Sequence, residues 1–354
     1  MPSPTVFLGM SGGVDSSASA VLLQQQGYRV VGVYMKNWSR DLPGMKCPWA
    51  EDLADAKRVA TKFNLDFEVW DFEQDYKSKV VDYMLAEFRA GRTPNPDIMC
   101  NQEIKFKLFY DIARERGADY IATGHYAKSE DGKLKLARDA NKDQTYFLYR
   151  ISQDAVAHTI FPLADLEKHE VKAFAAKHGL ANAYKKESMG VCFVGDVGMK
   201  DFLREFLPDA VRPGEIRELE SDQVLGLHDG AIFYTLGQRH GLSVGGGLPY
   251  YVVKKDLDKN IVYVSKNLNE KNLWTRELTL HDLFFRDQSD LPTDGKILVR
   301  LRHRAPFLSA HFCFNSNDTS SGSLLFDSEV KRPASGQSAV LYADDLCLGG
   351  GIIE

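Results

Sequence analysis

A loop of glycines, hydroxyls and one carboxylate near the N-terminus offers the clearest chemistry in this chain. Residues 11–16 read Ser-Gly-Gly-Val-Asp-Ser, between an apolar segment, 5–10, and a stretch with helical character, 17–26. Adjacent glycines let ligand oxygens approach the main chain closely. Unpaired N–H groups and the positive end of a helix dipole attract phosphate, and Asp15 either caps the helix or holds a magnesium ion. The loop predicts a phosphate-binding turn; the plain alternative is a Gly/Ser turn into a capped helix.

Cys100 is a candidate reactive thiol. It follows residues 93–97, Thr-Pro-Asn-Pro-Asp, whose two prolines predict a stiff extended loop and exclude a helix there. We expect a helix over 102–116 directly after Cys100, with Asn101 as a cap. A helix N-terminus stabilises a thiolate and lowers the thiol pKa below about 8.5, and Asp97 would be close enough to relay a proton. A small buried hydrophobe is an equally supported alternative.

Cys192 is the second cysteine in an unusual setting. Glycines lie on both sides of it, at 190 and 195, which predicts a mobile or tightly turned backbone. The alternative is a cysteine in a short buried strand. The spacing does not show whether Cys192 meets Cys100. No CxxC pair is present, so neither a structural zinc site nor a disulfide scaffold is expected. Three other cysteines are expected to be structural: Cys47, Cys313 and Cys347.

Strands and helices alternate up to about residue 205. Strands are predicted at 5–10, 29–35, 66–70 and 119–123, and helices at 17–26, 50–64 and 103–117. This alternation predicts an α/β fold with a doubly wound parallel sheet. Ligands of such sheets bind beyond the carboxyl ends of the strands, where Ser11, Met35 and Gly124 fall.

The pattern changes near residue 208. A hairpin over 250–264, turning at 258–260, predicts a small, β-rich middle domain. From Trp274 onward short alternating segments predict a small β-barrel or a sandwich, at 296–302, 310–314, 324–326 and 338–342. One alternation, over 300–304, would place three arginines on one face of a strand. We therefore expect three domains, at 1–207, 208–273 and 274–354.

The bulk composition is that of an ordinary globular protein. The 354 residues are 44% hydrophobic and 26% charged, with a formal net charge of −5. That balance argues against a broadly basic nucleic-acid coat but not against local basic patches. The absence of a long apolar run or a signal pattern predicts a cytoplasmic protein.

The chain resembles the tRNA-specific 2-thiouridylase family, a branch of the PP-loop ATP pyrophosphatases. The loop at 11–16 matches the SGGxDS pattern at every fixed position, and TPNPDxxCN at 93–101 and ATGHY at 122–126 are specific to the family. The resemblance covers essentially the whole chain. It implies a PP-loop domain followed by a small β domain and a β-barrel, as expected from the patterns above.

The resemblance also implies roles for particular residues. Cys100 corresponds to the nucleophile and Cys192 to the persulfide carrier. The implied ATP-binding residues are Gly9, Met10, Ser11, Gly12, Gly13, Val14, Asp15, Ser16, Met35 and Gly124. The implied tRNA contacts are Asn95, Pro96, Asp97, Lys142, Asp143, Gln144, Arg302 and His303, where a Tyr is expected at the last position.

The implied reaction replaces O2 of the wobble uridine of tRNA by sulfur. ATP with Mg²⁺ would activate O2, and a cysteine persulfide would deliver the sulfur. The implied partners are the tRNAs for Lys, Glu and Gln and a persulfide donor, such as a cysteine desulfurase or a sulfur-relay protein, with the enzyme a monomer. The alternatives are another PP-loop adenylating enzyme, of the 4-thiouridine synthetase or amidotransferase type, and a non-catalytic, ATP-dependent tRNA-binding protein.

Overall fold

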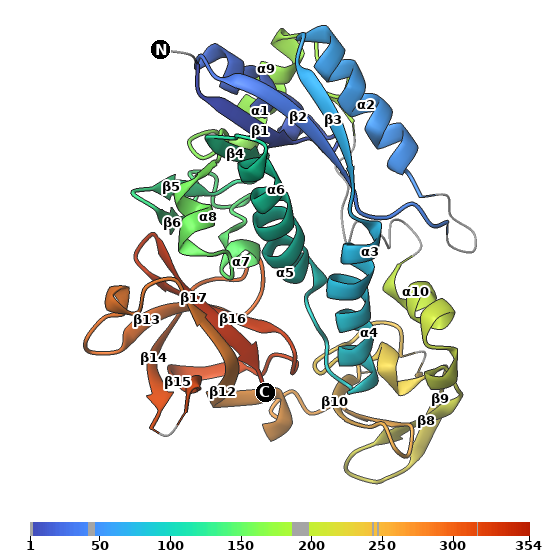
Figure 1. The fold of residues 1–354 in the computed structure, drawn as a ribbon. Helices are drawn as coiled ribbons and strands as arrows, with labels where there is room; N and C mark the ends of the chain where they lie inside the picture. The colour runs from blue at the N-terminus through green and yellow to red at the C-terminus, as the bar shows by residue number, and fades with distance from the viewer. Residues whose placement is uncertain (1–2, 42–46, 186–197, 243, 246–247, 317) are drawn as a thin grey trace.

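The chain folds into three parts (Figure 1). The structure is a computed structural model that describes residues 3–41, 47–185, 198–242, 244–245, 248–316 and 318–354. An α/β part comes first, a small β part lies in the middle, and a barrel ends the chain. Among the described helices, none is both long and apolar enough to cross a membrane.

A five-stranded parallel sheet, in the order β3-β2-β1-β4-β7, forms the centre of the first part. Its strands are β1 Thr5–Gly9, β2 Arg29–Lys36, β3 Asp66–Asp71, β4 Tyr120–Thr123 and β7 Thr159–Ile160. Val6 and Leu8 pack in one core with α1, α2 and α9, whereas Phe7 packs in another with α4 and α6. Successive side chains of a strand point to opposite faces, so helices cover both faces. The predicted doubly wound sheet is confirmed.

The helices connect and cover this sheet. They are α1 Val14–Gln25, α2 Trp49–Lys62, α3 Glu73–Tyr76, α4 Asp82–Arg89, α5 Pro96–Met99, α6 Phe109–Glu115, α7 Thr145–Leu148, α8 Gln153–Ala157, α9 Lys168–Lys177 and α10 Met199–Phe206. Two π-helical segments, η1 Lys77–Val81 and η2 Cys100–Leu108, join α3 to α4 and α5 to α6. The predicted helices at 17–26 and 50–64 correspond to α1 and α2.

The middle part is a four-stranded sheet in the order β10-β11-β8-β9. Its strands are β8 Gly214–Glu218, β9 Val224–His228, β10 Tyr251–Asp256 and β11 Ile261–Ser265. β10 and β11 pair antiparallel across a short turn, which confirms the predicted hairpin. Ile216, Val252 and Val262 form the centre of a separate small core.

The C-terminal part is a closed six-stranded barrel, as predicted. Its strands are β12 Trp274–Phe285, β13 Lys296–Arg300, β14 Leu308–Asn315, β15 Asp318–Lys331, β16 Ser338–Ala343 and β17 Leu346–Ile353. Pairing of β12 with β17 closes it. A Cβ on Gly349 would lie 2.1 Å from the Phe284 carbonyl oxygen, and one on Gly350 would lie 2.2 Å from that of Ala339. Glycines therefore let β17 fit between both neighbours.

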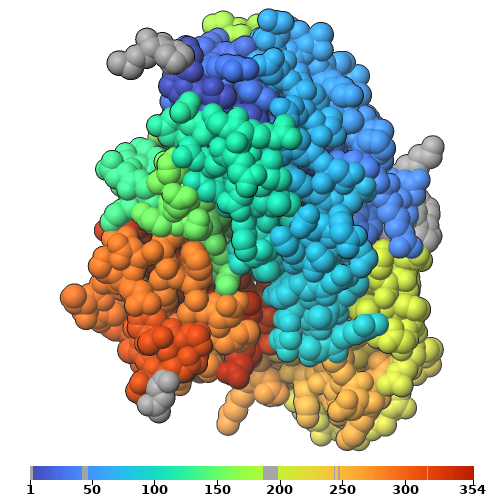
Figure 2. All heavy atoms as spheres, viewed as in Figure 1, coloured from blue at the N-terminus to red at the C-terminus, as the bar shows by residue number. Residues whose placement is uncertain are grey.

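The segment that leads to Cys100 connects the α/β part to both the barrel and the middle part by hydrogen bonds. The Thr93 N–H donates to the Ser335 carbonyl at 2.8 Å, and Gln337 Nε2 donates to the Thr93 carbonyl at 2.6 Å. On the other side, Lys255 Nζ of β10 donates to the Gly91 carbonyl at 3.0 Å. The space-filling view shows the end of α4 between the barrel and the middle part (Figure 2). These contacts fix the chain just before the Asn-Pro-Asp stretch.

A hairpin, β5 Lys128–Glu130 with β6 Lys133–Lys135, extends the barrel sheet from the first part. Nearby, a buried ion pair joins the same two parts: Arg300 Nη1 lies 2.9 Å from Asp143 Oδ1, and both side chains are under one-tenth exposed. Thr145 and the Ala137 N–H also donate to this carboxylate.

We expect Asp143→Ala to lower the free energy of unfolding by about 3–5 kcal/mol, because it leaves the Arg300 charge buried without its partner. Urea denaturation followed by circular dichroism measures this change. Glu329→Ala, at an exposed position of β15, is the matched control and should change stability by less than about 0.5 kcal/mol. Equal effects of the two substitutions would show that the buried pair does not hold the barrel.

Candidate active site

The predicted phosphate-binding loop opens helix α1. Gly13 is the N-cap, and no side chain caps the helix, so first-turn N–H groups lack intrahelical partners. The hydroxyls of Ser16 and Ser17 donate to the Gly13 carbonyl at 3.1 and 2.9 Å. These serines therefore fix the loop itself. The Gly13 N–H donates to Ser11 Oγ at 3.4 Å, and the N–H groups of the first turn of α1 are the candidate donors for an anion.

The structure brings together three segments that sequence analysis assigned to nucleotide binding. A Cβ on Gly9 would lie 2.8 Å from Met35 Cε, so the end of β1 lies against the end of β2. A Cβ on Gly124 would lie 2.8 Å from the Ser16 nitrogen, so the end of β4 packs on the start of α1. The carboxyl ends of β1, β2 and β4 thus meet at the loop, where this sheet topology places ligands.

Asp15 has two partners that sequence analysis missed. Lys168 Nζ, at the start of α9, lies 2.6 and 2.7 Å from the two carboxylate oxygens. Tyr126 donates its hydroxyl to Asp15 at 3.1 Å, and its N–H is bonded to Gln144 Oε1 at 3.0 Å. Tyr126 belongs to the ATGHY block, which could have drawn attention to it. No motif marks Lys168, because only the fold brings α9 to the loop.

The helix that carries Cys100 begins earlier than expected. Residues 93–95 lie outside the helix, as expected, and Asn95 is extended, but the expectation that no helix includes Pro96 and Asp97 and that the helix starts after Cys100 is wrong. Pro96 is the first residue of α5, a position that tolerates proline because its missing N–H would be unpaired anyway. Asn95 is the cap, and its side chain accepts from the Asp97 N–H at 3.2 Å. Cys100 lies more than one turn inside the helix and is 3% exposed, so the helix N-terminus does not activate it.

The positive charge of Lys105, in the Cys100 helix, affects the pKa of two groups, Asp97 and His125. Burial raises the pKa of the Asp97 carboxyl above its ordinary value, and Lys105 opposes this shift. Burial, aided by Lys105, lowers the pKa of His125 far below its ordinary value, so the imidazole is neutral. The His125 ring also lies 5.8 Å from that of Phe106, in η2. The Cys100 helix and the nucleotide loop therefore border one region, because His125 directly follows Gly124.

Two of the three segments assigned to tRNA binding, 142–144 and 302–303, lie together. Arg304 Nε donates to the Asn141 carbonyl at 2.8 Å, and the His303 ring lies 4.6 Å from that of Phe147. Lys142 and Gln144 flank Asp143, whose carboxylate is buried and bonded within the protein. Arg302 is exposed beside His303.

The expected strand face with three arginines is wrong. β13 ends at Arg300, which turns inward to Asp143, and the chain then makes a turn in which Arg304 has a φ of 60°. The buried ion pair with Asp143 holds the Arg300 side chain inside the protein, so Arg300 does not lie on an exposed face with Arg302 and Arg304. Only Arg302 and Arg304 remain exposed.

We expect the stability of the protein to fall as the pH decreases from about 6.5 to about 4, in part through His303. Burial, followed by Arg304, Arg300 and Lys142, lowers the pKa of His303 to about 4. The unfolded chain, with an ordinary histidine pKa of about 6.5, binds a proton over this range that the folded protein does not. Denaturant titrations at several pH values should show a flatter pH dependence for His303→Gln. His240→Gln, at an exposed position, should keep the wild-type slope, and an unchanged slope in His303→Gln would contradict the assignment.

The second cysteine, Cys192, lies outside the described residues. The described residues before it end at Lys185, seven residues earlier, and those after it begin at Gly198. Within the described part of the chain, no group of three or more His, Cys, Asp or Glu side chains is placed to hold a metal ion.

Family models cover the chain in succession. A tRNA methyl transferase HUP domain matches residues 4–196, a tRNA methyl transferase PRC-barrel domain matches 200–266, and an aminomethyltransferase beta-barrel domain matches 275–353. The tRNA-specific 2-thiouridylase MnmA of Shewanella denitrificans is 45% identical, over 99% of this chain and 95% of the relative. Those of Idiomarina loihiensis and Listeria welshimeri are 44% identical, over 99% of this chain and 96% and 94% of the relatives.

Proposed function

This chain belongs to the tRNA-specific 2-thiouridylase family, and we propose that it replaces O2 of the wobble uridine of tRNA by sulfur at the expense of ATP. The observation that carries the proposal is the meeting of an uncapped helix N-terminus, the Asp15–Lys168 pair and the Cys100 helix at one end of the parallel sheet. The Cys100 helix reaches the edge of the anion-binding loop through the Phe106–His125 ring contact, an arrangement that suits an activation followed by a sulfur transfer.

ATP activates the uracil. The C2 carbonyl is a poor electrophile, and transfer of AMP to O2 makes the carbon attackable and provides a stable leaving group. The main-chain N–H groups of residues 12–16 would stabilise the charge that develops on the departing pyrophosphate. Gly9, Met10 and Met35 would border the nucleoside, with Met35 against the adenine.

Mg²⁺ fits the loop through Asp15. The magnesium ion usually takes one or two carboxylates together with substrate phosphates and waters, and Asp15 offers one such carboxylate in the first turn of α1. When bound, Mg²⁺ supplies Lewis-acid stabilisation of the phosphate oxygens. Lys168 would then share Asp15 or move to a phosphate oxygen.

Sulfur arrives as a persulfide on Cys192. Its terminal sulfur attacks C2, the C2–O bond breaks, and AMP leaves with the oxygen. The Cys100 thiolate next attacks the Cys192 Sγ, the S–S bond breaks, and its electron pair remains on the sulfur now bound to C2. The product is the 2-thiocarbonyl, with a Cys100–Cys192 disulfide that an external thiol reduces. Alternatively, Cys100 attacks first and releases sulfide. Asp97, with its raised pKa, would relay the proton of Cys100.

The tRNA would lie over the surface formed by the Asn95–Asp97 turn and by Lys142, Gln144, Arg302 and His303. Turning the uridine out of the anticodon stack costs a few kcal/mol. Stacking on an aromatic ring returns about 1–3 kcal/mol, and the neutral His303 could provide that ring in place of the expected Tyr. Asp143 would act through Arg300 rather than by touching RNA.

The proposal also covers the oligomeric state of the enzyme, its location, its tRNA substrates and its sulfur donor. The enzyme would act as a monomer in the cytoplasm on the tRNAs for Lys, Glu and Gln. It would receive sulfur from a cysteine desulfurase or a sulfur-relay protein, which the Cys192 segment would have to reach.

The decisive experiment incubates the protein with ATP, Mg²⁺, unmodified tRNA and a persulfide donor. Nuclease digestion and mass spectrometry should find 2-thiouridine at the wobble position, with one pyrophosphate released per sulfur. Sulfur at another uridine position would instead indicate a 4-thiouridine synthetase type of enzyme. Binding of tRNA without pyrophosphate release would indicate a non-catalytic binder. Either result would overturn the proposal.

A further inference from the structure

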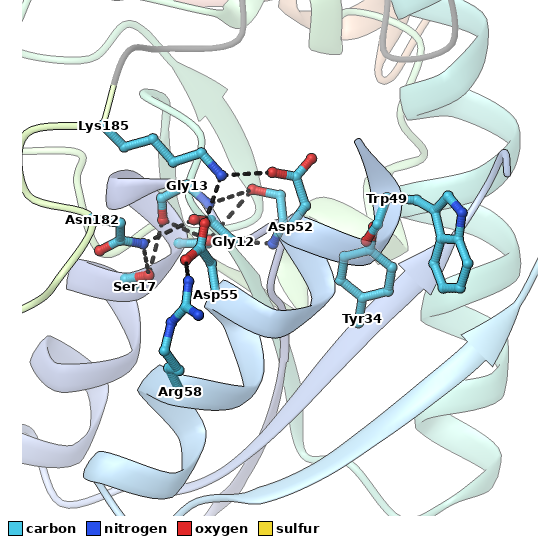
Figure 3. Close-up of polar contacts among 12 residues, drawn as sticks. Gly12, Gly13, Ser17, Tyr34, Trp49, Asp52, Asp55, Arg58, Asn182 and Lys185 are labelled. Atoms are coloured by element: carbon cyan, nitrogen blue, oxygen red, sulfur yellow. Dashed lines mark hydrogen bonds and ion pairs between the residues drawn. The ribbon is translucent and has the colours of Figure 1, made fainter. Parts of the chain in front are cut away.

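A polar anchor lies behind the nucleotide loop, on residues that no motif marks (Figure 3). Asn182 lies in the turn after α9 and is 4% exposed. Its Nδ2 donates to the Gly12 carbonyl and to Ser17 Oγ, both at 2.8 Å. Ser17 Oγ in turn donates to the Gly13 carbonyl at 2.9 Å. One amide group therefore holds two consecutive peptide carbonyls of the loop, one directly and one through a hydroxyl.

These contacts determine which way the loop presents its donors. In a trans peptide the carbonyl and the N–H point in opposite directions. Holding the Gly12 and Gly13 carbonyls toward Asn182 turns the N–H groups of Gly13 and Val14 to the other side, where the Gly13 N–H donates to Ser11 Oγ at 3.4 Å. Preorganised N–H groups stabilise an anion without the cost of reorienting them. Gly12, with a φ of 79°, would not stay in this conformation with a side chain.

A second contact, three residues further on, holds the helix that lies on the loop. Lys185 Nζ is 2.8 Å from Asp52 Oδ1 and 2.6 Å from Asp55 Oδ2, both in the first turns of α2. A Cβ on Gly12 would lie 2.3 Å from the Asp52 carbonyl oxygen, so the start of α2 rests directly on the loop. Lys185 thus keeps α2 against the face of Gly12, as Figure 3 shows.

We propose that Asn182 and Lys185 are positioning residues for the nucleotide loop: they fix its carbonyls and its covering helix so that its N–H groups are set for the phosphates of ATP. The inference rests on the proposed function for the identity of the nucleotide. Both residues come directly before the chain that carries Cys192, so sequence places the loop anchor and the sulfur-carrying cysteine on one short stretch.

The test measures nucleotide and tRNA binding separately. Asn182→Asp keeps the size of the side chain but replaces the donor by an acceptor opposite the Gly12 carbonyl. We expect its dissociation constant for a non-hydrolysable ATP analogue, measured calorimetrically with Mg²⁺, to rise about 10- to 100-fold. Its affinity for tRNA without nucleotide should stay at the wild-type value. Asn269→Asp, at an exposed position of the middle part, is the control for the added charge.

Lys185→Met gives a second, independent variant, and we expect a smaller rise in the same dissociation constant. Lys57→Met, at an exposed position of α2, is its control. Wild-type nucleotide affinity in both variants would overturn the inference, and so would a parallel loss of tRNA affinity in Lys185→Met, which indicates a general structural defect. If the wild-type protein forms no 2-thiouridine while the variants still lose nucleotide affinity, the proposed function fails and the positioning role stands.

Discussion

Replacing Cys192 by Ser is expected to abolish formation of 2-thiouridine while leaving ATP-dependent pyrophosphate release in the presence of tRNA unchanged. A serine hydroxyl cannot carry a persulfide sulfur, whereas activation of O2 by ATP does not involve this side chain. Mass spectrometry of digested tRNA measures the first quantity, and a coupled pyrophosphate assay measures the second. The separation of the two half-reactions is the strongest consequence of the proposed mechanism.

The control for this experiment is Cys313→Ser. Cys313 is an exposed cysteine of the barrel and should be replaceable without loss of activity. Cys100→Ser should also stop release of 2-thiouridine. The first route then leaves a disulfide-linked adduct between Cys192 and C2 of the uridine, whereas the sulfide route leaves the persulfide on Cys192, and mass spectrometry distinguishes the two. Undiminished thiolation in Cys192→Ser would show that sulfur reaches the uracil by another route and would remove the two-cysteine mechanism.

Replacing Asp15 by Ala is expected to lower the rate of pyrophosphate release by about 10²–10³-fold, the effect of losing one preorganised electrostatic contact in a transition state. Asp15 is the carboxylate available to Mg²⁺ in the loop, and its loss also removes the ion pair with Lys168. Affinity for tRNA should be largely retained, because the assigned tRNA contacts lie on other segments. Single-turnover assays and filter binding measure the two quantities.

Asp66→Ala provides the matched control, since Asp66 forms an exposed ion pair with Arg29 at the far end of the sheet. Such pairs contribute little, so its activity should be that of the wild type. Equal loss of pyrophosphate release and of tRNA binding in Asp15→Ala would contradict the division of the site into a nucleotide part and a tRNA part.

The prolines around Cys100 show where local reasoning failed. Two prolines in three residues suggested an extended loop, but one of them occupies the first helical position, where proline is favoured. The distinction depends on the φ and ψ angles of Asn95 and on its capping bond, which residue types alone do not fix. A thiol expected at a helix N-terminus is therefore a buried thiol inside a helix.

The prediction that the arginines of 300–304 share one strand face failed for a different reason. Alternation predicts a face only while the strand continues, and here the strand ends at the residue whose charge is needed inside. The partner, Asp143, is distant in sequence and belongs to another part of the fold. The three glycines of β17 likewise acquire their meaning only from the two strands that flank it.

The sequence by itself determined the elements and the chemistry that depend on local order. Sequence patterns specified β1–β4 of the parallel sheet and the helices α1 and α2, and contiguous motifs specified the loop, the two candidate cysteines and the family. Only the tertiary structure decided which distant groups support that chemistry: Lys168 and Tyr126 on Asp15, Asn182 behind the loop, and Arg300 on Asp143. These contacts are single side chains brought together by folding, and an isolated Lys, Tyr or Asn has no periodicity or spacing from which its partner could be read.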